Sequence, residues 1–295
     1  MISCRQSVFS INRPECAAFL FSKELIYQKK SMRQKGLLGV NRDYTARLQK
    51  GGAVLNEIRM IVRNWTNNES WEEQSRRIIE DNILGKKSIS RAKDVYSRVF
   101  LHRFLKGNPP EAWKIVRVLE DVNAPLEILT PVYYWITARS DELLYDFVIN
   151  DIMPRSRSHD QTVRVEETAA WLKNALAGQG QKWADSVIPK MSRALLAALR
   201  DFGILEGAAK KKIAPIFLPA ESFAYLAFTL SKLGKSGASL INHPDWNLFL
   251  MGKPLVERIF VEAHQKGFLR YDAAGNIYRI EFDADTYKEM ADVIS

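Results

Sequence analysis

Residues 71–105 read WEEQSRRIIEDNILGKKSISRAKDVYSRVFLHRFL, and this stretch decides how the first half of the chain is interpreted. The spacing of its apolar residues predicts a helix over residues 71–84, which Gly85 ends, and a second helix over residues 91–105. Helix, short turn, helix is the plan of helix-turn-helix proteins, whose second helix enters the major groove of DNA. The sequence therefore predicts a helix-turn-helix-like pair here.

The second of these helices begins in a run of positive charge. Residues 86–106 contain seven lysines and arginines, opposed only by Asp94. At about 100° per residue, a single helical face carries Lys87, Arg91, Asp94 and Arg98. Ala92, Val95 and Val99 lie on another face and are expected in the core, with Arg103 nearer that side. The exposed face is thus predicted to be basic.

These features suggest a contact surface for nucleic acid. Free backbone N–H groups at the start of a helix favour phosphate, and arginine can reach a base edge. Ser88 and Ser90 are both suitable N-cap residues, and Lys87 is better suited to phosphate than to bases. The predicted DNA-binding residues are Lys86, Lys87, Ser88, Ser90, Arg91 and Arg98. The basic turn of Lys210, Lys211 and Lys212 is predicted as a second DNA contact.

Simpler interpretations of the same residues stay open. Arg91, Asp94 and Arg98 have the spacing of surface ion pairs on one helix. Helix pairs are also common in bundles that bind no nucleic acid. The Lys210–Lys212 turn is equally typical of a solvated loop.

Charge is distributed unevenly along the chain, which carries a net charge of +9 over 295 residues. Residues 1–106 hold 21 lysines and arginines against 10 acidic residues, whereas residues 107–295 hold 22 against 24. A basic front joined to a nearly neutral back is what a polyanion-binding face produces. Residues 1–50 contain 10 basic and 3 acidic residues, so part of this charge falls in a segment with no clear helical or strand pattern.

The remaining patterns predict a mainly α protein. Leu55, Ile58, Val62 and Trp65 form an apolar stripe on a first helix, from which Glu57, Arg59 and Arg63 point away. Later helices are predicted over residues 111–122, 125–138, 141–152, 160–177, 191–202 and 254–266, with Asp160 as the cap of the fourth of these six. Strands over residues 268–271 and 276–282 flank a turn and predict a β-hairpin. Helix followed by hairpin is the local plan of a winged-helix module.

Three parts are expected along the chain. Residues 1–40 are predicted to be a weakly ordered or mis-annotated extension, with Met32 as an alternative start to Met1. Residues 41–178 form a helical domain, a bundle that contains the helix-turn-helix-like pair. Residues 181–295 form a second helical domain with the winged-helix-like hairpin, separated from the first by Gly178-Gln-Gly180.

Several functional classes are disfavoured. The two cysteines, Cys4 and Cys16, rule out a disulfide framework and suit a reducing compartment, so we expect a cytoplasmic protein. The four histidines have no metal-ligand spacing, and the sequence lacks phosphate-binding glycine loops and a nucleophile elbow. No apolar run approaches the roughly 20 residues that span a bilayer. We therefore expect no enzyme, cofactor, metal, small-molecule substrate or membrane contact.

Short motifs resemble the BrxA family of BREX bacteriophage-defence systems. They are the stretch from Tyr44 to Glu57 (YTARLQKGGAVLNE), Trp65 at the end of the first helix, Ser90-Arg-Ala92 and His102-Arg-Phe-Leu105. The similarity runs from about residue 41 to the end. The resemblance implies a small, non-catalytic accessory protein that binds double-stranded DNA, has a helical part similar to the antitermination factor NusB, and works beside other BREX subunits. The resemblance assigns no functional site residues to this chain.

Three functions therefore compete. The first is a DNA-binding accessory component of phage defence. The second is an interaction module whose basic face docks an acidic partner subunit. The third is RNA binding, which follows from the likeness to the antitermination factor.

Overall fold

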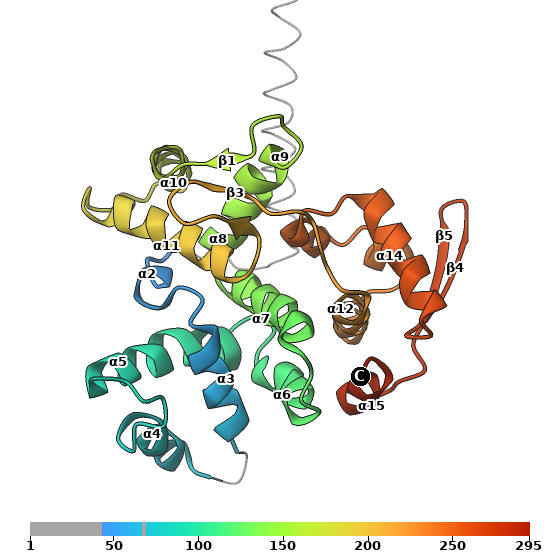
Figure 1. The fold of residues 1–295 in the computed structure, drawn as a ribbon, viewed down its shortest axis with the longest axis horizontal. Helices are drawn as coiled ribbons and strands as arrows, with labels where there is room; N and C mark the ends of the chain where they lie inside the picture. The colour runs from blue at the N-terminus through green and yellow to red at the C-terminus, as the bar shows by residue number, and fades with distance from the viewer. Residues whose placement is uncertain (1–42, 67–68) are drawn as a thin grey trace, which may run out of the picture. The chain divides into compact units, whose positions relative to one another are not determined.

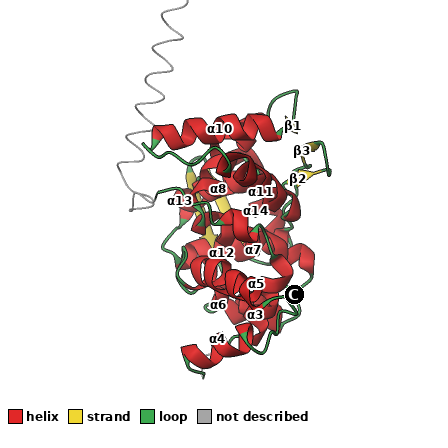
Figure 2. Ribbon diagram, turned by 90° about the vertical axis from the view of Figure 1, so that its left-hand side faces the viewer, coloured by secondary structure: helices red, strands yellow, loops and turns green. Residues whose placement is uncertain are grey.

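The computed structural model describes residues 43–66 and 69–295, and Asp43–Ser295 clusters as one compact unit. The predictions for residues 1–40 lie outside the described residues. Within the described part, helices predominate and the strands form two small antiparallel sheets, so the mainly α prediction is confirmed (Figures 1 and 2).

The first half of the described chain is helical. Its elements are α2 (Leu48–Gly51), α3 (Leu55–Asn64), α4 (Trp71–Ile79), α5 (Ile89–Asp94), the π-helix η1 (Val95–Leu105), α6 (Trp113–Asp121), α7 (Leu126–Ser140), α8 (Glu142–Phe147), the π-helix η2 (Val148–Ile152) and α9 (Met153–Arg155). The helix predicted over residues 91–105 is therefore α5 continued without a break by η1.

The second half mixes helices with short strands. Its elements are β1 (Thr162–Val163), α10 (Val165–Gly178), α11 (Val187–Asp201), β2 (Leu205–Glu206), β3 (Lys211–Ile213), α12 (Ala220–Lys232), α13 (Gly237–Ile241), the 3₁₀-helix η3 (Pro244–Phe249), α14 (Lys253–Gln265), β4 (Arg270–Ala274), β5 (Ile277–Glu281) and α15 (Tyr287–Val293). The predicted hairpin is confirmed as β4–β5, in which Arg270 pairs with Glu281 and Ala274 with Ile277.

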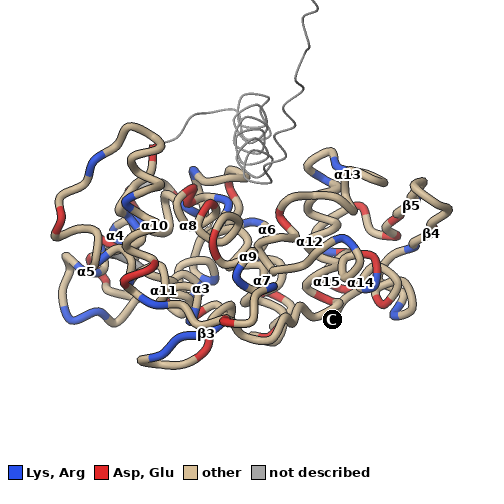
Figure 3. The backbone as a smooth tube through the Cα atoms, turned by 90° about the horizontal axis from the view of Figure 1, so that it is seen from above, with Lys and Arg blue, Asp and Glu red and all other residues tan. Residues whose placement is uncertain are grey.

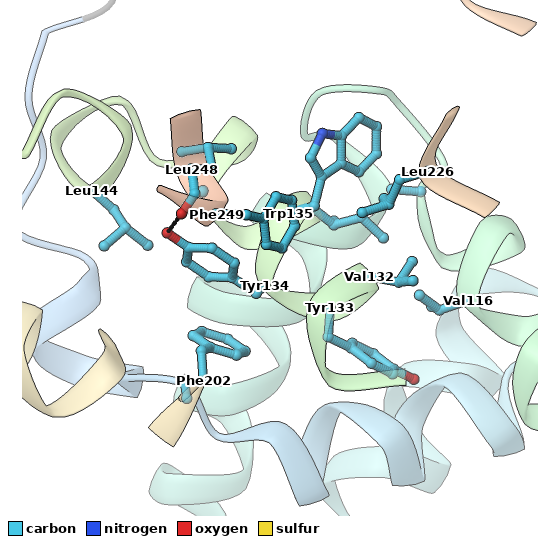
Figure 4. Close-up of a cluster of buried hydrophobic side chains, with 14 of the residues drawn as sticks. Val116, Val132, Tyr133, Tyr134, Trp135, Leu144, Phe202, Leu226, Leu248 and Phe249 are labelled. Carbon is cyan, nitrogen blue, oxygen red and sulfur yellow. Dashed lines mark hydrogen bonds between the residues drawn. The ribbon is translucent and has the colours of Figure 1, made fainter. Parts of the chain in front are cut away.

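Helix α7 forms the centre of the core and packs against η1, α6, α8, α12 and η3. Its residues Tyr133, Tyr134 and Trp135 are all buried and point to different neighbours. The hydroxyl of Tyr134 donates to the carbonyl of Leu248 at 3.0 Å (Figure 4). The ring of Tyr134 also packs against Phe202 and Phe249. A single helix thereby joins segments that lie more than 100 residues apart in the sequence.

The predicted division at Gly178–Gly180 falls between two helices that pack together. α10 and α11 lie side by side, and the three-stranded sheet β1–β3–β2 adds residues from both sides of the same point (Figure 1). The separation into two folding domains stays a prediction, because contacts do not measure how each half folds by itself.

Three helix boundaries differ clearly from the predictions. α11 begins at Val187 rather than at residue 191. α4 ends at Ile79 rather than Leu84, because Asn82 adopts the left-handed conformation, with φ of 50°, which stops the helix. α10 begins at Val165 with Arg164 at the cap position. The prediction of Asp160 as its cap was wrong, since that carboxylate accepts from the backbone of Thr162 in the preceding loop at 2.9 Å.

Candidate nucleic-acid interface

The loop between α4 and α5 is held by its own side chains. Asn82 Oδ1 accepts from the Lys86 amide at 2.9 Å, and its Nδ2 donates to the Lys86 carbonyl at 2.8 Å. Ser88 Oγ accepts from the backbone N–H of Arg91 at 3.2 Å, so Ser88 is the N-cap of α5 and Ser90 lies inside the helix. The start of α5 is therefore fixed on both sides of Lys87.

The continuous helix α5–η1 buries a single face. Ala92, Val95, Tyr96, Val99, Phe100 and Phe104 are buried, and Trp65 from the end of α3 packs on Phe100 with ring centroids 4.8 Å apart. The predicted core positions at Ala92, Val95 and Val99 are thus confirmed. Because this face is anchored, the opposite face, with Arg91, Lys93 and Arg98, remains exposed.

Arg103 lies in the core, as predicted. Its side chain is 1% exposed and donates to the carbonyl of Gly52 at 2.8 Å. Burial lowers the pKa of Arg103 to about 10, and the nearby charge of Asp141 opposes this shift. At neutral pH this guanidinium is charged and holds α2 and α3 against η1, so it is a structural residue.

Lys86 is less available than the sequence suggested. Its ammonium group forms an ion pair with Glu57 of α3, and both side chains are half-buried. Burial raises the pKa of Glu57, but the hydrogen bond and charge of Lys86, together with the charge of Arg91, lower it overall. Lys86 therefore links the α4–α5 loop to α3. Its contribution to a nucleic-acid interface is mainly its positive charge.

Lys87 and Lys93 are exposed and form no ion pair with any described residue. Arg91 is also exposed. Arg98 pairs with Asp94 at 2.8 Å, so the positive charge of Arg98 is compensated. Figure 3 marks the basic residues along the segment around α5. Lys93 was missed by the sequence analysis because it lies off the stripe calculated for a regular helix.

The Lys210–Lys212 turn is part of the hairpin formed by β2 and β3. Lys212 pairs with Glu206 at 2.9 Å, and the ammonium group of Lys211 donates to the carbonyl of Ala208 at 2.8 Å. Lys210 is exposed. Figures 1 and 2 both place β3 beside the α10–α11 pair and away from α5, so the structure does not bring the two predicted contacts together.

The β4–β5 hairpin carries no excess positive charge. Residues 253–283, which cover α14 and the hairpin, contain five lysines and arginines and five acidic residues. Arg270 pairs with Asp283 at 3.1 Å, and Arg279 pairs with Glu281 at 2.7 Å. A surface of this kind attracts phosphate weakly, which leaves the α5 region as the stronger candidate.

Other kinds of site find little support in the part of the chain that the structure describes. Among these residues there is no group of three potential metal ligands. No helix of the described residues has both the length and the apolar character needed to cross a membrane.

Three comparisons with known proteins bear on identity. A family model described as BrxA matches residues 42–229. A crystal structure of an uncharacterized protein from Magnetospirillum magneticum is similar in fold, with a TM-score of 0.53 and 16% sequence identity over 65% of this chain and 95% of that one. No curated protein matches the chain. Because the family model covers well over half of the residues, the resemblance seen in the sequence motifs is confirmed, and the chain belongs to the BrxA family of BREX phage-defence components.

Proposed function

We propose that this BrxA protein is a non-catalytic DNA-binding component of a BREX phage-defence system, acting in the cytoplasm beside other BREX subunits. The observation that carries the proposal is the exposed basic start of α5. Arg91 and Lys93 project from a helix whose opposite face is buried and whose first turn is capped by Ser88, and the exposed Lys87 directly precedes that cap. Cations on a rigid helix are suited to the phosphates of duplex DNA.

α4 and α5 form a helix-turn-helix-like pair in this proposal. The connection from Glu80 to Ser88 is longer than the usual three or four residues. α5 would therefore lie along the phosphates at the edge of the groove and present its first turn. Lys87, Ser88 and Arg91 are the main proposed contacts with the DNA phosphates. Lys93 and Arg98 lie near them on the same helix, and Lys86 adds positive charge without direct contact.

The carboxyl-terminal elements have a different role. α12, α13 and α14 followed by β4–β5 have the order of a winged-helix module, in which α14 packs on α12. Their neutral charge favours a protein partner over DNA, which fits an accessory subunit. In this proposal the turn at Lys210–Lys212 makes a secondary contact with DNA through Lys210.

A binding titration separates this proposal from its two rivals. Duplex DNA, single-stranded DNA and RNA of equal length are compared by fluorescence anisotropy at several salt concentrations. We expect the duplex to bind tightest, with a log–log salt slope near −0.9 for each phosphate neutralised. Tighter binding of RNA would favour the RNA-binding alternative. Binding of none of the three at low salt would contradict the proposal and favour the acidic protein partner.

A further inference from the structure

Ile89, the first residue of α5, places a large apolar side chain inside the basic segment. It is 61% exposed and lies between the exposed residues Ser88 and Ser90. Among the large apolar residues that the structure describes as exposed, Ile89 alone falls within residues 86–106. Single exposed apolar side chains are common on protein surfaces. This one differs in its position, at the end of the helix that carries the proposed phosphate contacts.

The geometry of the helix restricts the direction of this side chain. Ser88 caps α5 by accepting from the Arg91 amide at 3.2 Å, so the helix begins at Ile89 itself. Cα–Cβ bonds in a helix tilt toward its amino terminus, so a side chain in the first turn extends toward the end of the helix. A β-branched side chain also has few rotamers. Ile89 is therefore a short, stiff apolar group at the exposed end of α5.

Lysines lie on both sides of Ile89 along the chain, and both are exposed. Lys87 precedes it by two residues. Lys93 follows it by four, which places Lys93 one turn away on the same side of the helix. Phosphates bound by these two lysines would lie on either side of Ile89. An apolar group gains nothing from contact with phosphate, so Ile89 is directed at the bases between them.

The two grooves of duplex DNA differ in what they offer to an apolar side chain. The major groove admits an α-helix and carries the 5-methyl group of thymine, which apolar side chains contact. The minor groove is about half as wide and carries no methyl group. In RNA helices the major groove is too deep and narrow for side chains to read, and uracil lacks the methyl group. Thymine in the major groove is therefore the feature that matches Ile89.

We infer that Ile89 contacts the 5-methyl group of thymine in the major groove, so that the protein prefers duplexes whose bound segment contains thymine. The inference rests on the proposed function, because it requires that α5 binds duplex DNA. Lys87 and Lys93 supply affinity that is the same for every sequence, whereas Ile89 supplies the preference among bases.

Removal of the methyl group from the DNA tests the inference without any change to the protein. Short duplexes of one A·T sequence contain either thymine or uracil, and their affinities for the full-length protein are compared by fluorescence anisotropy at low salt. Uracil pairs with adenine as thymine does, so the duplexes differ only in their methyl groups. We expect the thymine duplex to bind about three- to four-fold more tightly for each methyl group that Ile89 contacts.

Substitutions assign the preference to one residue. Ile89→Ala introduces a good helix former at an exposed position and should bind the thymine and uracil duplexes equally. The matched control is Ile277→Ala, because Ile277 is 76% exposed at the β4–β5 hairpin and should keep the wild-type ratio of affinities. Lys87→Ala should weaken binding to both duplexes by the same factor and reduce the salt slope by about 0.9. Circular dichroism verifies that each variant is folded.

The outcomes separate this inference from the proposed function. Equal binding of the thymine and uracil duplexes by the wild type would overturn the inference and leave the proposed function intact. A preference for thymine that survives in Ile89→Ala would also overturn it, because another residue would then contact the methyl group. Binding of neither duplex at low salt would contradict the proposed function and the inference together.

Discussion

Nε of Arg98 lies 2.8 Å from Oδ1 of Asp94, within the basic segment that contains the proposed DNA contacts. This ion pair is exposed on the Arg98 side and joins residues four apart on one helix. Pairs of this kind add little to stability. The effect of this pair on DNA binding is larger. The carboxylate of Asp94 repels phosphate, and it also neutralises the guanidinium of Arg98, which would otherwise attract phosphate.

Removing that carboxylate should strengthen DNA binding. We expect Asp94→Asn to raise duplex affinity by about three- to ten-fold at low salt, and to steepen the salt slope by up to about 0.9 as Arg98 becomes available to phosphate. Anisotropy titrations with a fixed duplex measure both quantities.

A matched variant shows whether position or total charge is responsible. Asp121 on α6 forms a similar exposed pair with Arg117, at 2.6 Å, outside the basic segment. Asp121→Asn changes the net charge equally and should alter affinity by less than about two-fold. Equal gains in the two variants would mean that α5 has no special role.

Replacement of Arg103 should destabilise the fold rather than the DNA contact. Arg103→Met removes the larger of the two positive charges, those of Arg103 and Arg47, that oppose the rise of the Asp141 pKa on burial, and it removes the bond to Gly52. We expect a loss of about 3–5 kcal/mol in the free energy of unfolding, measured by urea denaturation. Arg103→Glu should be worse, because it adds a second buried carboxylate. Wild-type stability in both variants would show that this charge is not needed.

The carboxylate of Asp245 connects η3 to the central helix. It accepts from Trp135 Nε1 at 2.7 Å, from Arg139 at 2.6 Å and from Tyr145 at 3.1 Å. Asp245→Asn leaves the guanidinium of Arg139, which is 11% exposed, without a counter-charge. We expect it to lower the free energy of unfolding by about 3–5 kcal/mol.

The exposed pair of Asp283 with Arg270 supplies the comparison for that prediction. Both of its side chains are about two-thirds exposed, at 65% and 64%. Asp283→Asn should therefore cost less than about 1 kcal/mol in the same urea experiment. Similar losses of unfolding free energy in Asp245→Asn and Asp283→Asn would contradict the prediction that the buried ion pair stabilises the fold more than the exposed one.

His243 should make stability depend on pH. Burial lowers its pKa below 6.5, an effect that Asp245 opposes and that Arg139 and Lys235 reinforce. Below pH 6.5 the unfolded chain binds a proton at this position that the folded chain does not. Its contribution to stability is therefore complete above pH 6.5 and declines by at most about 1.4 kcal/mol per pH unit as the pH falls toward the folded pKa.

Urea unfolding of wild type and His243→Asn at pH 7.5, 6.5 and 5.5 measures this contribution. The slope of stability against pH should be shallower in the variant across this range. Parallel slopes would mean that another group is responsible.

The sequence predicted the parts of this fold that depend on neighbouring residues. The buried positions of Ala92, Val95 and Val99 and the β4–β5 hairpin follow from local patterns, which also gave Ser88 as one of two candidate caps. The partners of the charged residues did not follow from such patterns. Arg59 and Arg63 lie off the apolar stripe of α3 and look like surface cations, yet both bind the fully buried carboxylate of Glu120, each at 2.6 Å.

The candidate site illustrates the same limit. Lys86 was predicted as a contact from the charge run alone, but its partner Glu57 is 29 positions earlier and approaches it only after α3 packs against η1. Lys93 was overlooked because it lies off the stripe of Lys87, Arg91 and Arg98, although its side chain is exposed on α5. Ion pairs between distant segments are set by packing, which one sequence does not reveal.

The most direct test of the proposed function is the binding of duplex DNA by Lys87→Glu/Arg91→Glu. The matched control is Lys173→Glu/Lys190→Glu, which makes the same change in net charge at exposed lysines of α10 and α11. We predict that the first variant keeps the wild-type circular dichroism spectrum and loses at least about 100-fold in affinity at low salt, while the control loses less than about five-fold. Equal affinities for wild type and the Lys87→Glu/Arg91→Glu variant would contradict the account.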